Sequence, residues 1–229
     1  ETREEKFTTI NTPFNPTIDT LAKACQLTQE ALIQAVKKRV LSTERKYACL
    51  LSGGLDSSLI TAIVNQFCKK GELETYSIGL EGSEDLKYAR KVADFLDTKH
   101  TEIICTEKEF LDAIPEVIQK IESYDTTTVR ASVGNYLVSK YIANHSEAKV
   151  IFNGDGSDEV CGGYLYFHLA PNAIAFDKEC RRLLNDIHLF DVLRSDRSIS
   201  SNGLEARTPF LDRHFVQSFL SIPPKFRFE

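Results

Sequence analysis

The chain of 229 residues contains no methionine and no tryptophan, and its first residue is Glu1. We therefore expect it to be a segment of a longer protein or a processed chain. It also lacks an apolar stretch long enough to cross a bilayer and a secretory signal pattern. The sequence predicts no membrane partner, and a cytoplasmic location is expected.

Closely spaced cysteines and an excess of basic residues are also missing. The six cysteines lie at least 19 positions apart, which excludes CxxC pairs and zinc-binding spacings. We expect them to be reduced thiols. The 28 basic residues are outnumbered by 33 acidic residues, for a net charge of -5. This charge gives no electrostatic basis for binding nucleic acid.

A glycine-rich turn is the most informative feature that the sequence does contain. Apolar residues at 47–51 predict a buried strand, and those spaced along 59–67 predict an amphipathic helix. The turn between them reads SGGLDSS, at 52–58. Glycines let a backbone approach an anion closely, and a helix start offers unpaired N–H groups and the positive end of the dipole. The turn therefore predicts a phosphate site.

The turn differs from two well-known phosphate-binding loops. It has no lysine after its last glycine, as a mononucleotide P-loop requires, and its two adjacent glycines do not match the dinucleotide fingerprint. The hydroxyls of Ser52, Ser57 and Ser58 and the backbone N–H groups could instead hold a pyrophosphate. Asp56 suits a magnesium ion that bridges to phosphate. The alternative is a plain strand-to-helix turn in which Asp56 or Ser57 caps the helix.

Strands and helices alternate along the chain. Further strands are predicted at 75–78, 100–105 and 149–153, and helices at 83–96, 106–121 and 130–142. This alternation predicts an α/β fold, with a parallel sheet covered by helices on both faces. Residues 1–27 have weak periodicity and are predicted to form a linker or arm, whereas residues 28–229 form the domain.

Three polar loops follow predicted strands and should open on one edge of the sheet, where ligands bind. They are 52–58, 79–85 and 154–159. The last loop, GDGSDE, holds three carboxylates, which would repel bound phosphate unless a divalent cation lay between them. We predict that Asp56 and Asp158 are Mg²⁺ ligands. The alternative is an acidic surface loop that caps the next helix.

Arg130 lies at the start of a predicted helix, after three threonines. A positive charge there is unfavourable to the helix dipole. One interpretation is that Arg130 holds an anionic group. The other is that it pairs with a nearby carboxylate.

Five segments, in this order, are similar to the synthetase domain of glutamine-dependent asparagine synthetases over residues 29–224: SGGLDSS, IGLEGSEDLKYARKVADFL, ESYDTTTVRAS, GDGSDEVCGGYLYFHLAPN and NGLEARTPFLD. The resemblance implies a Rossmann-like adenine nucleotide α-hydrolase fold of the ATP pyrophosphatase (PP-loop) group, with a helical C-terminal part. It implies an AMP-forming carbon–nitrogen ligase with ATP and Mg²⁺ as cofactors. Such an enzyme converts aspartate to β-aspartyl-AMP, releases pyrophosphate, and aminates the intermediate with ammonia.

The resemblance also implies roles for individual residues. Nucleotide and pyrophosphate binding is expected of Leu50, Ser52, Gly53, Gly54, Asp56, Ser57, Ser58, Ile78, Asp85, Asn153 and Gly154. Catalysis, or handling of the substrate and intermediate, is expected of Thr127, Thr128, Arg130 and Asp155.

The chain departs from the family pattern in its acidic turn. The family turn is SGEGSDE, whereas this chain has NGDGSDE, with Asn153 for Ser and Asp155 for Glu. The Asp155 carboxylate therefore reaches about 1.5 Å less far, the length of one bond. The family's glutaminase domain and a basic segment beyond the PFLD motif have no counterpart in these residues.

The resemblance implies a glutaminase domain in the full protein, as in other glutamine amidotransferases, and leaves a homodimer open. Two alternatives to an asparagine synthetase remain. One is a related amide-forming ligase that acts on another carboxylate, and the other is a non-catalytic nucleotide-binding protein.

Overall fold

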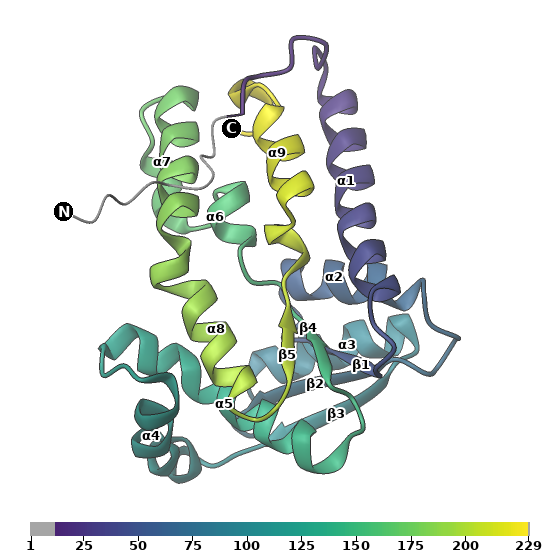
Figure 1. Cartoon of the computed structure of the whole chain (residues 1–229), viewed down its shortest axis with the longest axis vertical. Helices are drawn as coiled ribbons and strands as arrows, with labels where there is room; N and C mark the ends of the chain where they lie inside the picture. The colour runs from purple at the N-terminus through teal and green to yellow at the C-terminus, as the bar shows by residue number, and fades with distance from the viewer. Residues whose placement is uncertain (1–11, 229) are drawn as a thin grey trace, which may run out of the picture.

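A parallel sheet of five strands forms the centre of the computed structural model, which describes residues 12–228 (Figure 1). The strands are β1 (Tyr47–Leu50), β2 (Glu74–Gly79), β3 (Lys99–Ile104), β4 (Val150–Phe152) and β5 (Glu205–Arg207). Their order is β3-β2-β1-β4-β5, and every neighbouring pair is parallel. The sheet therefore grows outward from β1 in two directions, as in doubly wound folds.

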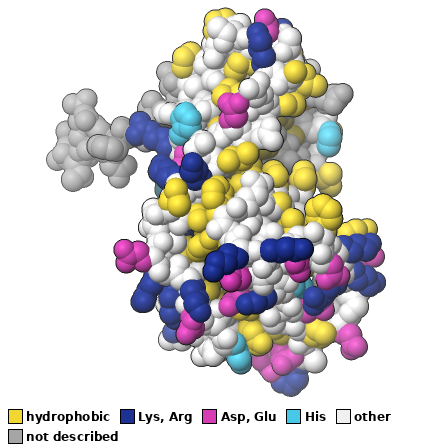
Figure 2. Space-filling view, turned by 90° about the vertical axis from the view of Figure 1, so that its right-hand side faces the viewer, with side chains coloured by type: hydrophobic (Ala, Val, Ile, Leu, Met, Phe, Trp, Pro, Cys, Tyr) yellow, Lys and Arg dark blue, Asp and Glu magenta, His cyan; other side chains and the backbone are white. Residues whose placement is uncertain are grey.

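Helices cover both faces of the sheet, as the alternation in the sequence predicted. They are α1 (Leu21–Leu41), α2 (Leu55–Asn65), α3 (Glu84–Leu96), α4 (Glu107–Ile121), α5 (Thr126–His145), α6 (Ser157–Cys161), α7 (Ala173–Asp186), α8 (Asp191–Ser200) and α9 (Arg213–Ser221). None of these helices is long and apolar enough to cross a membrane. On the face drawn in Figure 2, basic and acidic side chains are interspersed over the lower half of the molecule.

An apolar core lies on each face of the sheet. Phe152 and its neighbour Ile151 are both fully buried, and they point to opposite faces because side chains alternate along a strand. Phe152 packs with residues of α1, α2 and α9, whereas Ile151 packs with residues of α5 and α8. A strand covered on both faces reads as a continuous apolar run, which explains the sequence VIF of β4.

One boundary and one strand differ from the sequence predictions. α1 begins at Leu21, where the Thr20 side chain accepts a hydrogen bond from the Lys23 N–H, so the end of the predicted linker 1–27 is helical. Residues 1–11 of that linker lie outside the described residues. The strand β5 was not predicted, because its sequence, EAR, contains no apolar run.

Several local predictions are confirmed. The helix predicted at 106–121 is α4, which begins with a capping box of Thr106 and Glu109 and continues through Pro115. The six cysteines are free thiols, of which Cys49 and Cys180 are buried.

Asp212 joins the start of α9 to the end of α1. Its buried carboxylate accepts hydrogen bonds from the His214 N–H (2.9 Å), Arg39 Nη1 (2.6 Å) and Lys38 Nζ (3.1 Å). Burial by itself would raise the pKa of Asp212, but the two cations outweigh this effect and lower the pKa to about 2. The ionised form is therefore the form that stabilises the fold.

This ion pair predicts a loss of stability in acid. Because the folded pKa is below the unfolded value, the stabilisation is present above about pH 4 and is lost as the pH falls toward 2. Its size is about 2 kcal/mol. Urea unfolding of the wild type and of Asp212→Asn should differ by this amount at pH 6 and by about half of it near pH 3. A difference that stays constant with pH would contradict the prediction.

Candidate functional site

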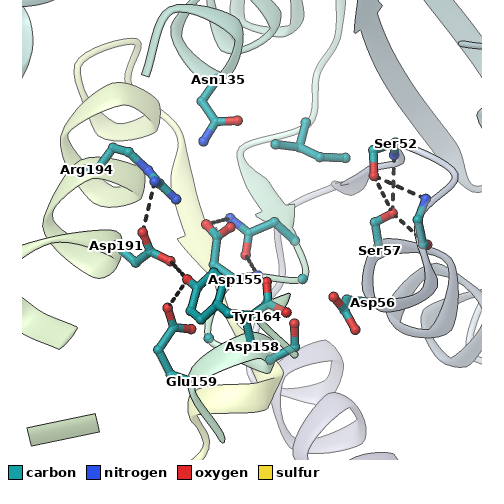
Figure 3. A pocket seen from close by; sticks show the side chains of 16 residues that line it. Ser52, Asp56, Ser57, Asn135, Asp155, Asp158, Glu159, Tyr164, Asp191 and Arg194 are labelled. Atoms are coloured by element: carbon teal, nitrogen blue, oxygen red, sulfur yellow. Dashed lines mark hydrogen bonds and ion pairs between the residues drawn. The ribbon is translucent and has the colours of Figure 1, made fainter. Parts of the chain in front are cut away.

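A cleft of about 390 Å³ opens beyond the carboxyl ends of β1 and β4 (Figure 3). These are the strands at which the chain order of the sheet reverses, the place where doubly wound sheets bind ligands. The cleft is lined by Leu50, Ser52, Gly54, Asp56, Ser57, Asn135, Asn153, Gly154, Asp155, Gly156, Ser157, Asp158, Glu159, Tyr164, Asp191 and Arg194. Two of the three predicted loops, 52–58 and 154–159, therefore meet in one site.

The glycine-rich turn forms one wall of the cleft. α2 begins within it, at Leu55, with Gly54 as the N-cap residue and no side-chain cap, so the N–H groups at the helix start stay available to a ligand. The alternative in which Asp56 or Ser57 caps the helix is therefore wrong. The Ser52 and Ser57 hydroxyls lie 3.0 Å apart, and Ser57 Oγ also accepts from the Ser52 N–H at 3.2 Å.

Two glycines allow this wall to pack closely. Gly53 has φ +81°, and a Cβ placed there would lie 2.5 Å from the carbonyl carbon of Tyr88 in α3. A Cβ on Gly154 would lie 3.0 Å from Asp56 Cβ and from the Ser57 backbone nitrogen. The glycine-rich turn, which we call the phosphate loop after its predicted role, is therefore in contact with α3 on one side and with the acidic turn on the other. Gly53 itself does not line the cleft.

Asp56 and Asp158 approach each other across the cleft floor (Figure 3). Burial raises the pKa of Asp158, and the negative charge of Asp56 raises it further. Within residues 12–228, no group of three or more His, Cys, Asp or Glu side chains forms a metal cluster. Two facing carboxylates do suit a Mg²⁺ ion, which typically takes one or two carboxylates and completes its shell with phosphate oxygens and water.

Asn153 and Asp155, the two departures from the family turn, contact each other. Asn153 is buried, and its Nδ2 donates to Asp155 Oδ2 (2.7 Å) and to Ser195 Oγ (3.0 Å) in α8. Burial raises the pKa of Asp155, although the hydrogen bond from Ser195 and the charge of Arg194 act in the opposite direction. The amide thus ties this carboxylate to the α8 wall.

The wall opposite the phosphate loop contains residues that the sequence predictions missed: Asn135, Asp191 and Arg194. Arg194 Nη1 lies 2.9 Å from Asp191 Oδ1. Glu159, also on this side, is fully buried, and burial raises its pKa to about 7. The i, i+3 spacing of Asp191 and Arg194 on one helix was the available signal, but it does not by itself indicate a ligand site.

Some predicted site residues do not line the cleft: Gly53, Ser58, Ile78, Asp85, Thr127, Thr128 and Arg130. Arg130 is exposed in the second turn of α5, which begins at Thr126, so it does not open the helix as expected. It also forms no ion pair with the described residues, so the predicted pairing alternative is not found here. Asp85 is exposed in the first turn of α3. The ligand roles of these residues stay predictions.

Known proteins resemble this chain over most of its length. The family model described as asparagine synthase matches residues 27–176 and 170–229. The chain is 50% identical over 197 residues to the asparagine synthetase [glutamine-hydrolyzing] of Homo sapiens, and 49% identical to that of Gallus gallus. Each match covers 84% of this chain and 35% of the relative, so the chain spans about a third of the length of these curated relatives.

Two solved structures resemble the chain more weakly than these relatives do. The NH3-dependent NAD synthetase from Campylobacter jejuni has a TM-score of 0.43 and 15% identity, covering 78% of this chain and 94% of that one. A similarity this low supports no statement about ligands. The family match, by contrast, extends over nearly all the described residues. The chain belongs to the asparagine synthase family.

Proposed function

We propose that this chain is the part of an asparagine synthetase that activates aspartate with ATP and passes the activated carboxylate to ammonia. The observation that carries the proposal is the contact between the phosphate loop and the acidic turn in one cleft, at Gly154. Relatives at about 50% identity are named asparagine synthetases, which favours aspartate as the carboxylate.

The right-hand wall in Figure 3 would hold the departing pyrophosphate. N–H groups at the start of α2 and the hydroxyls of Ser52 and Ser57 are donors fixed in place before a ligand arrives, so they stabilise developing negative charge without reorganisation. Asp56 and Asp158 would hold Mg²⁺, which when bound neutralises charge on the phosphates. Leu50 and Gly154 line the same cleft, and we assign them to contacts with the nucleotide.

Asp155 would act on the amination step. Attack of the ammonia lone pair on the acyl-adenylate carbonyl forms the C–N bond and leaves a proton on nitrogen. A carboxylate that is tied in position by Asn153 and Ser195 can accept that proton as the bond to AMP breaks. Thr127, Thr128 and Arg130, at the start of α5, stay candidates for contacts to the intermediate.

The remaining expectations concern the complete protein. The relatives are named as glutamine-hydrolyzing, and we propose that ammonia here also comes from a glutaminase domain. A homodimer and a cytoplasmic location belong to the same proposal.

The test is ATP–pyrophosphate exchange by the full-length protein with MgCl₂. We expect exchange that depends on aspartate, and a loss of at least about 100-fold in Asp158→Asn. Asp97→Asn, an exposed side chain of a turn outside the cleft, is the control. Faster exchange with another carboxylic acid would instead identify a related ligase, and ATP binding without exchange would identify a non-catalytic protein.

The departures in the acidic turn predict that Asn153 and Asp155 act as a pair. Asn153→Ser removes a donor from Asp155, and Asp155→Glu pushes a longer side chain against Asn153. Each single substitution should lower the rate of asparagine formation about tenfold, whereas the double variant, which restores the family turn, should lie within about threefold of the wild type. Rates that multiply independently in the double variant would show that the two positions are not coupled.

A further inference from the structure

The charge of the cleft is unbalanced. Among the described residues that line it, one side chain, Arg194, is basic. Five are carboxylates: Asp56, Asp155, Asp158, Glu159 and Asp191. An anionic substrate entering such a site is repelled unless a cation receives it. Mg²⁺ between Asp56 and Asp158 would serve the phosphates on one side, which leaves Arg194 as the positive charge on the other.

One hydrogen-bond donor of Arg194, its Nε–H, is unpaired among the described residues. Its Nη1 pairs with Asp191 Oδ1 at 2.9 Å, but its Nε is buried and has no hydrogen-bond partner. A buried, unsatisfied donor is costly, and such groups in native proteins are usually completed by a ligand or water. Figure 3 shows Arg194 facing the cleft from the wall across from Ser52 and Ser57. An anion at Arg194 is therefore separate from the phosphates at the loop.

Tyr164 fixes the position of the Asp191–Arg194 pair. Its hydroxyl donates to Glu159 Oε1 and lies 3.3 Å from Asp191 Oδ2. Asp191 thus contacts Arg194 through one carboxylate oxygen and Tyr164 through the other, so its rotation is defined at both ends. Glu159, the acceptor of that hydrogen bond, is fully buried in α6. These contacts connect Glu159, the last residue of the acidic turn, through Tyr164 to Asp191 and Arg194 in α8.

We propose that Tyr164 is a positioning residue of this cleft, which through Asp191 directs the free Nε–H of Arg194 toward the carboxylate of the amino acid substrate that is not activated. The inference rests on the proposed function for the identity of the substrate. The activated carboxylate must lie beside the nucleotide phosphates, so the second carboxylate of aspartate is the anion that remains to be bound on the α8 wall. Asn135 lines the cleft near Arg194, and its side-chain amide is a second candidate donor to this carboxylate.

The first test compares Tyr164→Phe with Tyr166→Phe in the full-length protein. Tyr166 stacks on Tyr164, but its hydroxyl donates to Glu179, outside the cleft. We expect Tyr164→Phe to raise the KM for aspartate about tenfold, the effect of a hydrogen bond to a charged group. The KM for ATP should change less than twofold, and Tyr166→Phe should behave as the wild type. An unchanged KM for aspartate in Tyr164→Phe would overturn the inference.

Arg194→Lys gives a second arm, because lysine keeps the charge but has no Nε donor in this geometry. It should raise the KM for aspartate at least as much as Tyr164→Phe does. The double variant should be no worse than Arg194→Lys alone, since both changes remove the same contact. Independent, multiplying losses would show that Tyr164 does not act through Arg194.

A third arm does not depend on turnover. In protein labelled with ¹⁵N-arginine, the Arg194 Nε–H signal, assigned by its loss in Arg194→Lys, should shift when aspartate is added. Tyr164→Phe should speed its hydrogen exchange, and Tyr166→Phe should not. If the wild type shows no ATP–pyrophosphate exchange, the proposed function fails, and the effect of aspartate on this signal still decides the inference: no shift at saturating aspartate would refute it.

Discussion

Gly53→Ala is expected to lower the free energy of unfolding by about 3 kcal/mol and to abolish pyrophosphate binding at the proposed site. A side chain at φ +81° costs about 1 kcal/mol in backbone strain. The added Cβ would also meet the backbone of Tyr88 and Ala89, atoms that cannot rotate away, so α3 must shift at a further cost of about 2 kcal/mol. Urea unfolding measures the first effect, and isothermal titration with inorganic pyrophosphate and MgCl₂ measures the second.

The matched control for this change is Gly82→Ala. Gly82 has a similar backbone angle, φ +76°, but a Cβ there would have no atom within 4 Å. It should therefore cost about 1 kcal/mol, from backbone strain alone, and should leave pyrophosphate binding intact. Equal losses in the two variants would mean that the packing of the loop on α3 contributes nothing.

Asp177→Ala is expected to lower the free energy of unfolding by about 3–5 kcal/mol. Asp177, in α7, accepts hydrogen bonds from Arg181 Nε (2.8 Å) and from Arg227. Arg227 is 2% exposed, so loss of the carboxylate leaves a guanidinium charge buried without its partner. Removing both charges should destabilise the fold less than removing one. Asp177→Ala combined with Arg227→Met should therefore regain part of the lost free energy of unfolding. Thermal and urea unfolding measure both variants.

Asp186→Ala controls for the loss of an acidic residue from the same helix. Asp186 lies 3.6 Å from Arg182, and both side chains are about half exposed, so their ion pair contributes at most about 0.5 kcal/mol. A loss below about 1 kcal/mol in Asp177→Ala would contradict the assignment of Asp177 as the anchor between α7 and the C-terminal turn.

Local patterns predicted the half of the site that is encoded locally. The strand at 47–50, the glycines and α2 are continuous in the sequence, so the pattern from apolar strand to polar turn to helix was sufficient to place the glycine-rich turn. The acidic turn follows β4 in the same way. Parallel pairing of β1 with β4 then brings the two loops together, as the general rule for such sheets predicts.

The opposite wall could not be predicted in this way. Asp191 and Arg194 reach the cleft because α8 packs on α5 and beside β5, contacts that no short pattern encodes. Family resemblance assigned roles to Thr127 and Arg130. A motif match, however, does not specify the direction in which a side chain points from its helix. Thr127 lies in the first turn of α5 and Arg130 in the second, and neither lines the cleft.

Because Cys49 of β1 pairs with Phe152 of β4, this part of the sheet cannot form until β4 has been synthesised. β1, β2 and β3 leave the ribosome as one contiguous unit, yet the central neighbour of β1 on its other side is encoded about a hundred residues later. At translation rates of about 5–20 residues per second, the backbone N–H and C=O groups on this edge of β1 stay unpaired for on the order of 5–20 s before β4 is made. The nascent chain therefore exposes an unpaired strand beside the glycine-rich turn, and we expect chaperone capture to be strongest in that interval.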